Sequence, residues 1–160
     1  AIPAHAQDET YTLIKKEGDI AIYERWVNFP GITPPIQARE VKGEFTVSNN
    51  MYAAMALVKN AKLIKKWQSH VSEFKVYIQP DTSVWFEYSY HDIPWPVSDQ
   101  DHFLMYKIVN ATDNTLLVNF ESRVSNTVAP VREGVSRMGL SGSWYFQQVS
   151  PTKTKVVYKI

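Results

Sequence analysis

The residues of this sequence that could do acid–base or metal chemistry are few and scattered. None of the four histidines occurs in an HxH or HExxH pattern. The one gathering of potential metal ligands is His91, Asp92, Asp99, Asp101 and His102. It has a simpler interpretation, in which the two aspartates Asp92 and Asp99 cap a proline-rich turn and His102 begins a strand. We therefore expect no metal site.

Covalent catalysis and nucleotide binding have equally little support. Cysteine is absent, which excludes thiol catalysis, a thiolate zinc site and a disulfide framework. Residues 139–143 read Gly-Leu-Ser-Gly-Ser, which lacks the G-x-S-x-G spacing of a nucleophile elbow. The six glycines form neither a GxGxxG nor a GxxxxGK phosphate loop. We expect no catalytic residue of these classes and no cofactor.

Composition indicates one globular domain with a real core. The chain has 160 residues, of which 44% are hydrophobic and 13% are aromatic. A chain of this length buries about two-thirds of the surface that its unfolded form exposes, so it needs no metal or disulfide to fold. The net charge of +1 argues against a nucleic-acid partner, which would require a strongly basic face. No apolar run is long enough for a membrane-spanning helix.

The first residues carry a pattern of protein export. Ala4-His5-Ala6 before a polar residue fits the small-x-small end of a secretory signal peptide, with cleavage after Ala6. We interpret residues 1–10 as a signal-peptide remnant or tail and residues 11–160 as the folded domain. The alternative is an unstructured tail that happens to hold these alanines. The export interpretation predicts a periplasmic or secreted bacterial protein.

The elements that must position these residues are mostly strands. Period-two alternation between turn signals predicts strands over residues 11–15, 20–27, 38–47, 74–79, 83–91, 102–109, 115–124, 143–149 and 155–160. Asp81-Thr82 and Asp113-Asn114 fit hairpin turns between neighbouring strands. A series of this kind with one helical insertion predicts an α+β domain, built on a single curved antiparallel sheet.

Helical spacing occurs in one region. Met51, Ala54, Met55 and Val58 follow the N-cap candidates of residues 48–50 and predict a short helix to about residue 59. Residues 61–67 should add another turn or two, with Trp67 turned inward and lysines outside.

Large aromatic residues are concentrated on the predicted strands. A sheet with one helix packed on it has limited interior volume, so these side chains indicate either a thick core or the lining of a cavity for an apolar ligand. Composition alone leaves both alternatives open.

One connecting segment resembles a known family. Residues 94–101 read Pro-Trp-Pro-Val-Ser-Asp-Gln-Asp, similar to the P-W-P-V-S-D-R-D run of bacterial START domains (steroidogenic acute regulatory protein-related lipid transfer). The similarity runs from about residue 11 to residue 160, and its other parts are Ile22-Tyr23-Glu24-Arg25, Trp67, Pro130, Gly134-Val135-Ser136-Arg137, Gly142-Ser143-Trp144-Tyr145-Phe146 and the strand that begins at Thr154.

The resemblance implies a helix-grip fold, in which a curved antiparallel sheet encloses a hydrophobic tunnel, with short helices after the third strand. It implies a non-enzymatic protein that binds a lipid, sterol or similar hydrophobic molecule and transfers it, with transient membrane contact. The family's long C-terminal helix is absent from the sequence as given, which stops in the last expected strand. Either the chain is truncated there, or the remainder is disordered or removed. An open tunnel would expose apolar surface, so we expect dimerisation or domain exchange.

Two positions depart from the family's polar residues. Several members bury an acid and an arginine on adjacent strands of the tunnel; Glu87 matches the acid, but Tyr106 occupies the arginine position. Without an ion pair, Glu87 should have a raised pKa, hydrogen-bond Tyr106 or reach water. This predicts a ligand with a hydroxyl or carbonyl head group. The alternative is that Glu87 faces solvent on the outer side of its strand. Gln100 replaces the arginine of the S-D-R-D run.

Strand alternation assigns the remaining contact residues. The outward positions Lys107, Asn119 and Glu121 leave their neighbours facing the tunnel. The predicted ligand-contact residues are Trp67, Val76, Ile78, Trp85, Glu87, Leu104, Tyr106, Val118, Phe120, Ser122, Trp144 and Phe146, with Trp85 placed beside Glu87 by the resemblance alone. For Arg137 we favour a structural ion pair with the sheet over a place at the tunnel mouth.

Two other functions remain open at this stage. The chain could be a cyclase- or aromatase-like enzyme of the same superfamily that acts on a polyketide-like substrate, with Glu87, Tyr106 or His91 as acid–base groups. It could also be an interaction module whose cavity is filled by its own aromatic side chains.

Overall fold

The structure is a computed structural model that describes residues 10–29 and 31–160. Its elements are β1 (Thr12–Glu17), β2 (Ile20–Asn28), β3 (Gln37–Val47), α1 (Met51–Val58), the short 3-10 helix η1 (Ile64–Lys66), β4 (Val71–Ile78), β5 (Val84–His91), β6 (Gln100–Ala111), β7 (Thr115–Ser122), β8 (Ser136–Arg137), β9 (Ser141–Ser150) and β10 (Lys153–Lys159). The predicted cleavage site after Ala6 lies outside the described residues, so the boundary at residue 10 stays a prediction.

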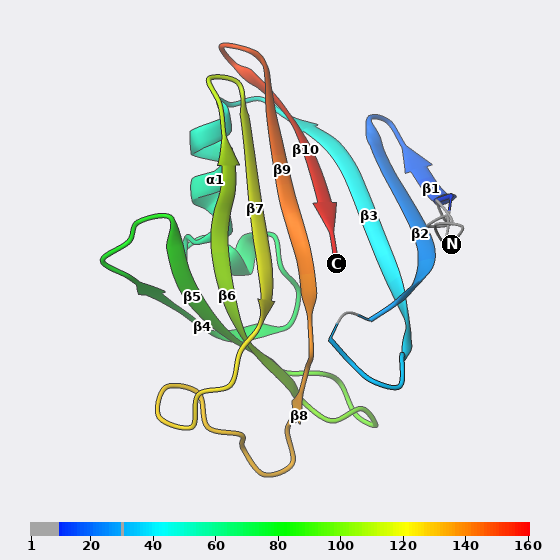
Figure 1. Cartoon of the computed structure of the whole chain (residues 1–160), viewed down its shortest axis with the longest axis vertical. Coiled ribbons are helices and arrows are strands. Elements are labelled where there is room, and N and C mark those ends of the chain that lie inside the picture. Colours follow the sequence, from blue (N-terminus) through cyan, green and yellow to red (C-terminus); the bar gives the residue numbers. More distant parts are fainter. Residues whose placement is uncertain (1–9, 30) are drawn as a thin grey trace, which may run out of the picture.

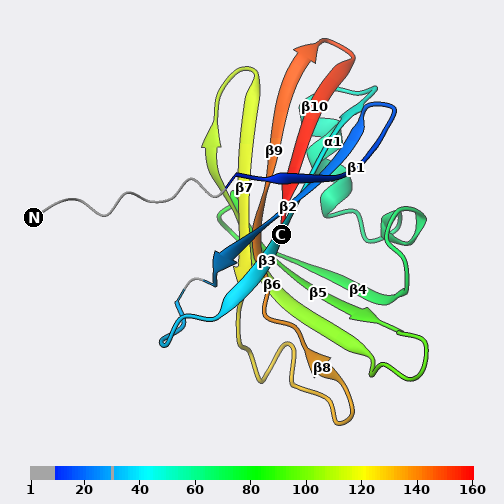
Figure 2. The ribbon, with the colours of Figure 1, turned by 90° about the vertical axis from the view of Figure 1, so that its right-hand side faces the viewer.

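All strands of the described residues belong to one sheet. Its order is β1-β2-β3-β10-β9-β7-β6-β5-β4 with antiparallel neighbours, and β8 pairs in parallel with β6. The sheet is strongly curved, and α1 lies against one face (Figures 1 and 2). The predicted antiparallel α+β architecture and both predicted hairpin turns are confirmed. β8 was not predicted, because two residues are too few to show alternation.

Helix α1 begins where the sequence predicts it. The Asn50 side chain accepts a hydrogen bond from the amide of Ala53, as an N-cap does, and Lys59 is the C-cap. Met51, Ala54 and Val58 are buried, as the spacing requires. The helix therefore turns its apolar side toward the sheet.

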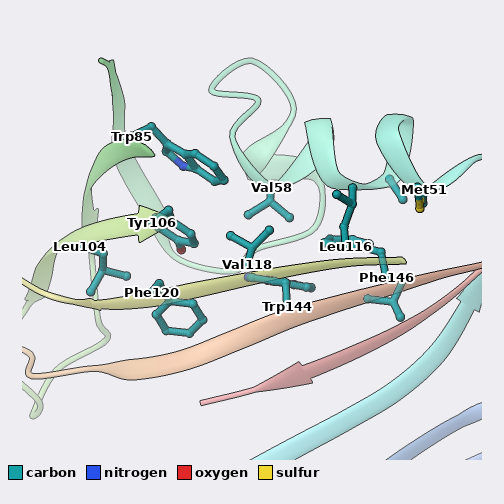
Figure 3. Close-up of a cluster of buried hydrophobic side chains, with 12 residues drawn as sticks. Met51, Val58, Trp85, Leu104, Tyr106, Leu116, Val118, Phe120, Trp144 and Phe146 are labelled. Atoms are coloured by element: carbon teal, nitrogen blue, oxygen red, sulfur yellow. The ribbon is translucent and has the colours of Figure 1, made fainter. Parts of the chain in front are cut away.

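The inner face of the sheet, on which α1 packs, holds the main core. Alternation in β6, β7 and β9 has the predicted phase, because Val118 and Phe120 are buried while Asn119 and Glu121 are exposed. Figure 3 shows this core as a row of side chains beneath α1. The buried members are Met51, Ala54, Val58, Trp85, Leu104, Tyr106, Leu116, Val118, Phe120, Trp144, Phe146 and Val156.

The opposite, outer face carries a second cluster under a long connection. Residues 123–140, here called the outer strap, cross the face that bears Tyr88 and Phe103, and Ala129 packs between them. Arg137 of the strap binds Asp101 of β6 with Nε at 2.6 Å and Nη2 at 3.0 Å. The predicted structural role of Arg137 is therefore confirmed, and the strap is tied to the sheet.

Candidate functional site

An apolar cavity of about 310 Å³ opens on the inner face of the sheet. Its volume lies near the lower end of the range for small-molecule sites. Three elements of the sheet, α1 and the residue after η1 form its wall, which consists of Phe45, Val47, Ala54, Leu57, Val58, Trp67, Trp144, Phe146 and Val156.

The wall contains no charged side chain and presents almost only carbon. Burial of apolar ligand surface against such a wall contributes about 0.8 kcal/mol for each methylene group. The cavity can therefore hold an aliphatic or ring-shaped apolar body, and it can hold it without polar contacts.

Aromatic rings shape the mouth and the floor. Trp67 is 43% exposed and stands edge-on to Trp144, with ring centroids 6.3 Å apart. Trp144 in turn stacks on Phe146 at 6.2 Å and on Tyr158 at 4.0 Å. Trp67 thus forms a half-open rim, and the Trp144 ring separates the cavity from the side chains behind it.

A polar cluster around Glu87 is buried in the core and does not line the cavity. Glu87 is 2% exposed, so the interpretation that placed it on the solvent side is wrong. Its cross-strand partner is Leu104, and its two diagonal neighbours on β6 are His102 and Tyr106. His102 Nε2 lies 3.0 Å from Glu87 Oε1, and the Tyr106 hydroxyl is a second hydrogen-bond partner of this carboxyl.

Burial dominates the electrostatics of this cluster. Desolvation raises the pKa of Glu87 above its ordinary 4.5, and His102 and Tyr106 oppose this only in part. Burial and the neighbouring Glu87 raise the pKa of Tyr106 well above 10. The pKa of Tyr158 is also raised, mainly by burial and then by Glu87. Tyr158, which stacks on Trp144, is therefore also influenced by the charge of Glu87.

A second histidine lies beside the cluster. His91 Nε2 lies 3.0 Å from the hydroxyl of Ser89, and its ring centroid is 5.4 Å from that of His102. Burial and the nearby His102 lower the pKa of His91 below 6.5. His91 is therefore favoured in its neutral form.

The Pro94–Val97 turn is held by an aspartate, as expected. Asp99 accepts hydrogen bonds from the Tyr90 hydroxyl at 2.6 Å and from the Ile93 amide at 3.0 Å. Trp95 at the tip of the turn is 91% exposed. No group of three or more side chains that could hold a metal ion occurs within residues 10–29 and 31–160.

The structure divides the predicted contact residues into three groups. Trp67, Trp144 and Phe146 line the cavity. A second group packs beside it in the core, partly buried for Val76 and fully buried for Trp85, Leu104, Tyr106, Val118 and Phe120. The third group lies elsewhere and contains Ile78 and Ser122, and Glu87 belongs to the buried polar cluster described above.

Ile78 and Ser122 need correction as lining residues. Ile78 shares the inner face with Trp85, but it lies near the end of the edge strand β4 and is 64% exposed, because nothing covers that edge. The Ser122 hydroxyl accepts a hydrogen bond from the Leu140 amide at 2.7 Å and serves to fix the end of the outer strap. Ligand contact by the other predicted residues stays a prediction.

Six wall residues were missed by the sequence interpretation. They are Phe45, Val47, Ala54, Leu57, Val58 and Val156. Alternation in β3 and helical spacing in α1 did identify the buried sides of these elements. What it lacked was the position of β10 between β3 and β9, which brings Phe45 and Val47 to the same wall as Phe146.

Comparisons with known proteins agree on the fold. No protein-family model matches the chain. An uncharacterised protein of Pseudomonas aeruginosa is 24% identical over 160 residues, which are 99% of this chain and 75% of that protein. Human STARD10 superposes with a TM-score of 0.76 at 12% identity and covers 93% of this chain, while this chain spans only 59% of STARD10.

A bacterial structure is similar to the same degree. A STAR-related lipid transfer protein fragment of Xanthomonas axonopodis gives a TM-score of 0.72 at 22% identity, over 93% of this chain and 79% of that one. The chain has a START fold. The Zhui aromatase/cyclase of Streptomyces is more distant, with a TM-score of 0.52 at 11% identity over 76% of this chain and 65% of that one. The START resemblance predicted from residues 94–101 is thus confirmed for the fold.

Proposed function

We propose that this protein binds one lipid, sterol or similar hydrophobic molecule in the apolar cavity and does not change it chemically. The observation that carries this proposal is the wall itself, a roughly 310 Å³ hollow lined only by apolar side chains within a START fold. Two structural neighbours, the Xanthomonas protein and human StAR-related lipid transfer protein 5, are named for lipid transfer, which supports transfer as a further step.

The head group of the ligand should be uncharged. The cavity wall offers no cation to an anionic head, and the core beside the cavity holds the hydroxyls of Tyr158 and Tyr106 and the carboxyl of Glu87. These groups can hydrogen-bond a hydroxyl, whereas a second carboxylate beside Glu87 would be repelled. This supports the prediction of a hydroxyl or carbonyl head group.

Native mass spectrometry of the protein purified from a bacterial host tests the binding proposal. We expect a co-purified apolar molecule, released by solvent extraction, and saturable binding of a pyrene-labelled long-chain alcohol. Ala54→Phe fills the cavity from α1 and should abolish probe binding, whereas Ala56→Phe on the exposed side of the same helix should not. Equal binding by both folded variants would place the ligand elsewhere.

The cyclase alternative is less well supported. Its candidate acid–base groups Glu87, Tyr106 and His91 are absent from the cavity wall, so the apolar body of a substrate in the cavity would not touch them. Incubation with polyketide-like aromatic precursors tests this alternative directly, and turnover that is lost in Glu87→Gln would establish it. The alternative of a filled interior is not favoured, because the cavity is open.

Location and self-association are further parts of the proposal. The Ala4-His5-Ala6 pattern supports export to the bacterial periplasm, and fractionation of cells that express the full reading frame tests it. Leu13, Ile14 and Trp26 on β1 and β2 are about half exposed, which supports self-association through this end of the sheet. Light scattering during gel filtration tests that part. In the part of the chain that the structure describes, no helix could span a membrane.

A further inference from the structure

The segment between α1 and β4 combines a charge imbalance with the rim of the cavity. Residues 57–67 contain four lysines and no acidic residue. They contribute +4, so the rest of the chain carries −3 if the whole has a net charge of +1. The net positive charge of the protein therefore comes from this one segment, here called the lysine rim.

The lysines are available to an external partner. Lys62, Lys65 and Lys66 are exposed, and Lys59 is half-buried with its ammonium 4.6 Å above the Trp85 ring. None of the four forms an ion pair with a carboxylate among the described residues, whereas Lys15 and Lys42 elsewhere do. A charge cluster without internal partners is a feature that an external anion can use.

The lysine rim is bounded by two apolar side chains that line the cavity. Leu57 at its start is 41% exposed and Trp67 at its end is 43% exposed. Figure 2 shows the segment at the edge of the molecule, between α1 and β4. Exposed lysines flanked by an aliphatic side chain and a tryptophan match the interface of a bilayer, where charges meet head groups and indole rings enter the boundary layer.

Trp95 is a second exposed tryptophan, and the charges around it differ from those around Trp67. Trp95 is 91% exposed, but residues 92–99 contain two aspartates and no lysine or arginine. An anionic surface repels this turn and attracts the lysine rim. Charge therefore selects Trp67 over Trp95 as the residue that enters a membrane.

We propose that the lysine rim, residues 57–67, docks the protein on an anionic lipid surface and presents the mouth of the apolar cavity to the bilayer. This proposal rests on the proposed function, because docking matters only if the cavity takes up a ligand from the bilayer. Each lysine near an anionic surface strengthens partitioning about fivefold at low ionic strength. Removal of three exposed lysines should therefore weaken it about 100-fold.

The test uses the whole protein and vesicles of phosphatidylcholine with and without phosphatidylglycerol. We expect cosedimentation only with the anionic vesicles, and a sharp decrease at an ionic strength of about 0.15 M. The triple variant of Lys62, Lys65 and Lys66 to Gln should lose binding, and the triple variant of Lys75, Lys153 and Lys155 to Gln, which makes the same change in net charge, should keep it. Trp67→Ala should weaken binding, and Trp95→Ala should not.

Binding of the pyrene-labelled alcohol in solution separates the two proposals. Lys62, Lys65 and Lys66 do not line the cavity, so their variant should bind the probe as the unchanged protein does. Two results would contradict docking through the lysine rim: an equal loss of vesicle binding in both triple lysine variants, or binding to neutral vesicles as strong as to anionic ones. Neither result would affect the proposal that the cavity binds a ligand. Failure of every variant to bind the probe would overturn the cavity proposal instead.

Discussion

Arg137 and Asp101 form a two-point ion pair that joins the outer strap to strand β6. Asp101 is 1% exposed and accepts a third hydrogen bond, from the Tyr88 hydroxyl at 2.9 Å. The guanidinium also donates to the carbonyl of Ala129 at 3.1 Å. Arg137 therefore compensates the buried charge of Asp101 and holds the outer strap against the face of the sheet that bears Tyr88.

Loss of this arginine should be costly. Arg137→Met leaves the Asp101 carboxylate buried without a cation, and we expect a loss of roughly 3 kcal/mol in the free energy of unfolding. Urea denaturation at pH 7 measures it. Arg123→Met is the control, because its pair with Glu121 is partly exposed and should change stability by less than about 1 kcal/mol. Equal losses in the two variants would contradict the assigned role of Arg137.

The same pair should make stability depend on pH. Burial acts to raise the pKa of Asp101, but the hydrogen bonds from Arg137 and Tyr88 outweigh it, so the pKa lies below its ordinary 3.8. The unfolded state then binds the proton first as the pH falls, so the contribution of the pair is complete above pH 3.8 and is lost as the pH falls through the folded pKa. The gap in unfolding free energy between the unchanged protein and Arg137→Met should narrow at acid pH. A gap that is constant down to acid unfolding would rule this out.

Position 142 in β9, which holds a glycine, should not accept a residue with a side chain. A Cβ on Gly142 would lie 2.0 Å from the Lys159 carbonyl oxygen and 2.5 Å from the Phe120 ring, so the backbone of β10 would have to move. We expect Gly142→Ala to lower the free energy of unfolding by about 3 kcal/mol or to prevent folding. Gly43→Ala in β3, where a Cβ meets nothing within 4 Å, should be neutral or stabilising. Thermal denaturation of both variants decides the matter.

Head-group selection should depend on Glu87. An alcohol probe should bind roughly tenfold more tightly than the carboxylate probe with the same chain, because a hydroxyl can hydrogen-bond the polar cluster and a carboxylate is repelled. Glu87→Gln removes the ionisable group and should reduce this preference, whereas the exposed control Glu121→Gln should retain it. Fluorescence titration at pH 7 gives both affinities. Unchanged selectivity in Glu87→Gln would exclude a role for this residue.

His91 should destabilise the fold in mild acid. Burial lowers its pKa below 6.5, so the unfolded state binds the proton more readily. Its contribution is complete above pH 6.5 and is lost as the pH falls through the folded pKa. His91→Gln, which can still hydrogen-bond Ser89, should therefore lose less stability between pH 6.5 and acid pH than the unchanged protein. Parallel curves for the two proteins would contradict this.

The local sequence pattern was sufficient to predict most of the strands and the helix α1. Asn119 and Glu121 against Val118 and Phe120 set the phase of β7, and the Asn50 cap with Ala54 and Val58 set α1. These signals are local, because they depend only on side-chain direction within one element.

The candidate site was harder to predict, because its contacts depend on pairing between segments that are distant in the sequence. His102 was identified only as the start of a strand, because its contact with Glu87 follows from the β5–β6 register across the turn at residues 92–99. Ile78 was misplaced since alternation gives the face but not the edge position of β4. Arg137 was placed correctly in general terms, while its partner Asp101 emerged only from the path of the strap.

The position of β10 between β3 and β9 has a consequence for how the chain assembles. The first three strands have no partner among β4–β9 and join them solely through β10, the last strand to be synthesised among those described. Until it arrives, β3 and β9 each present a long row of unpaired amides and carbonyls to any other extended chain. Folding should therefore be slow, and nascent or nicked chains that lack this strand should be prone to aggregate.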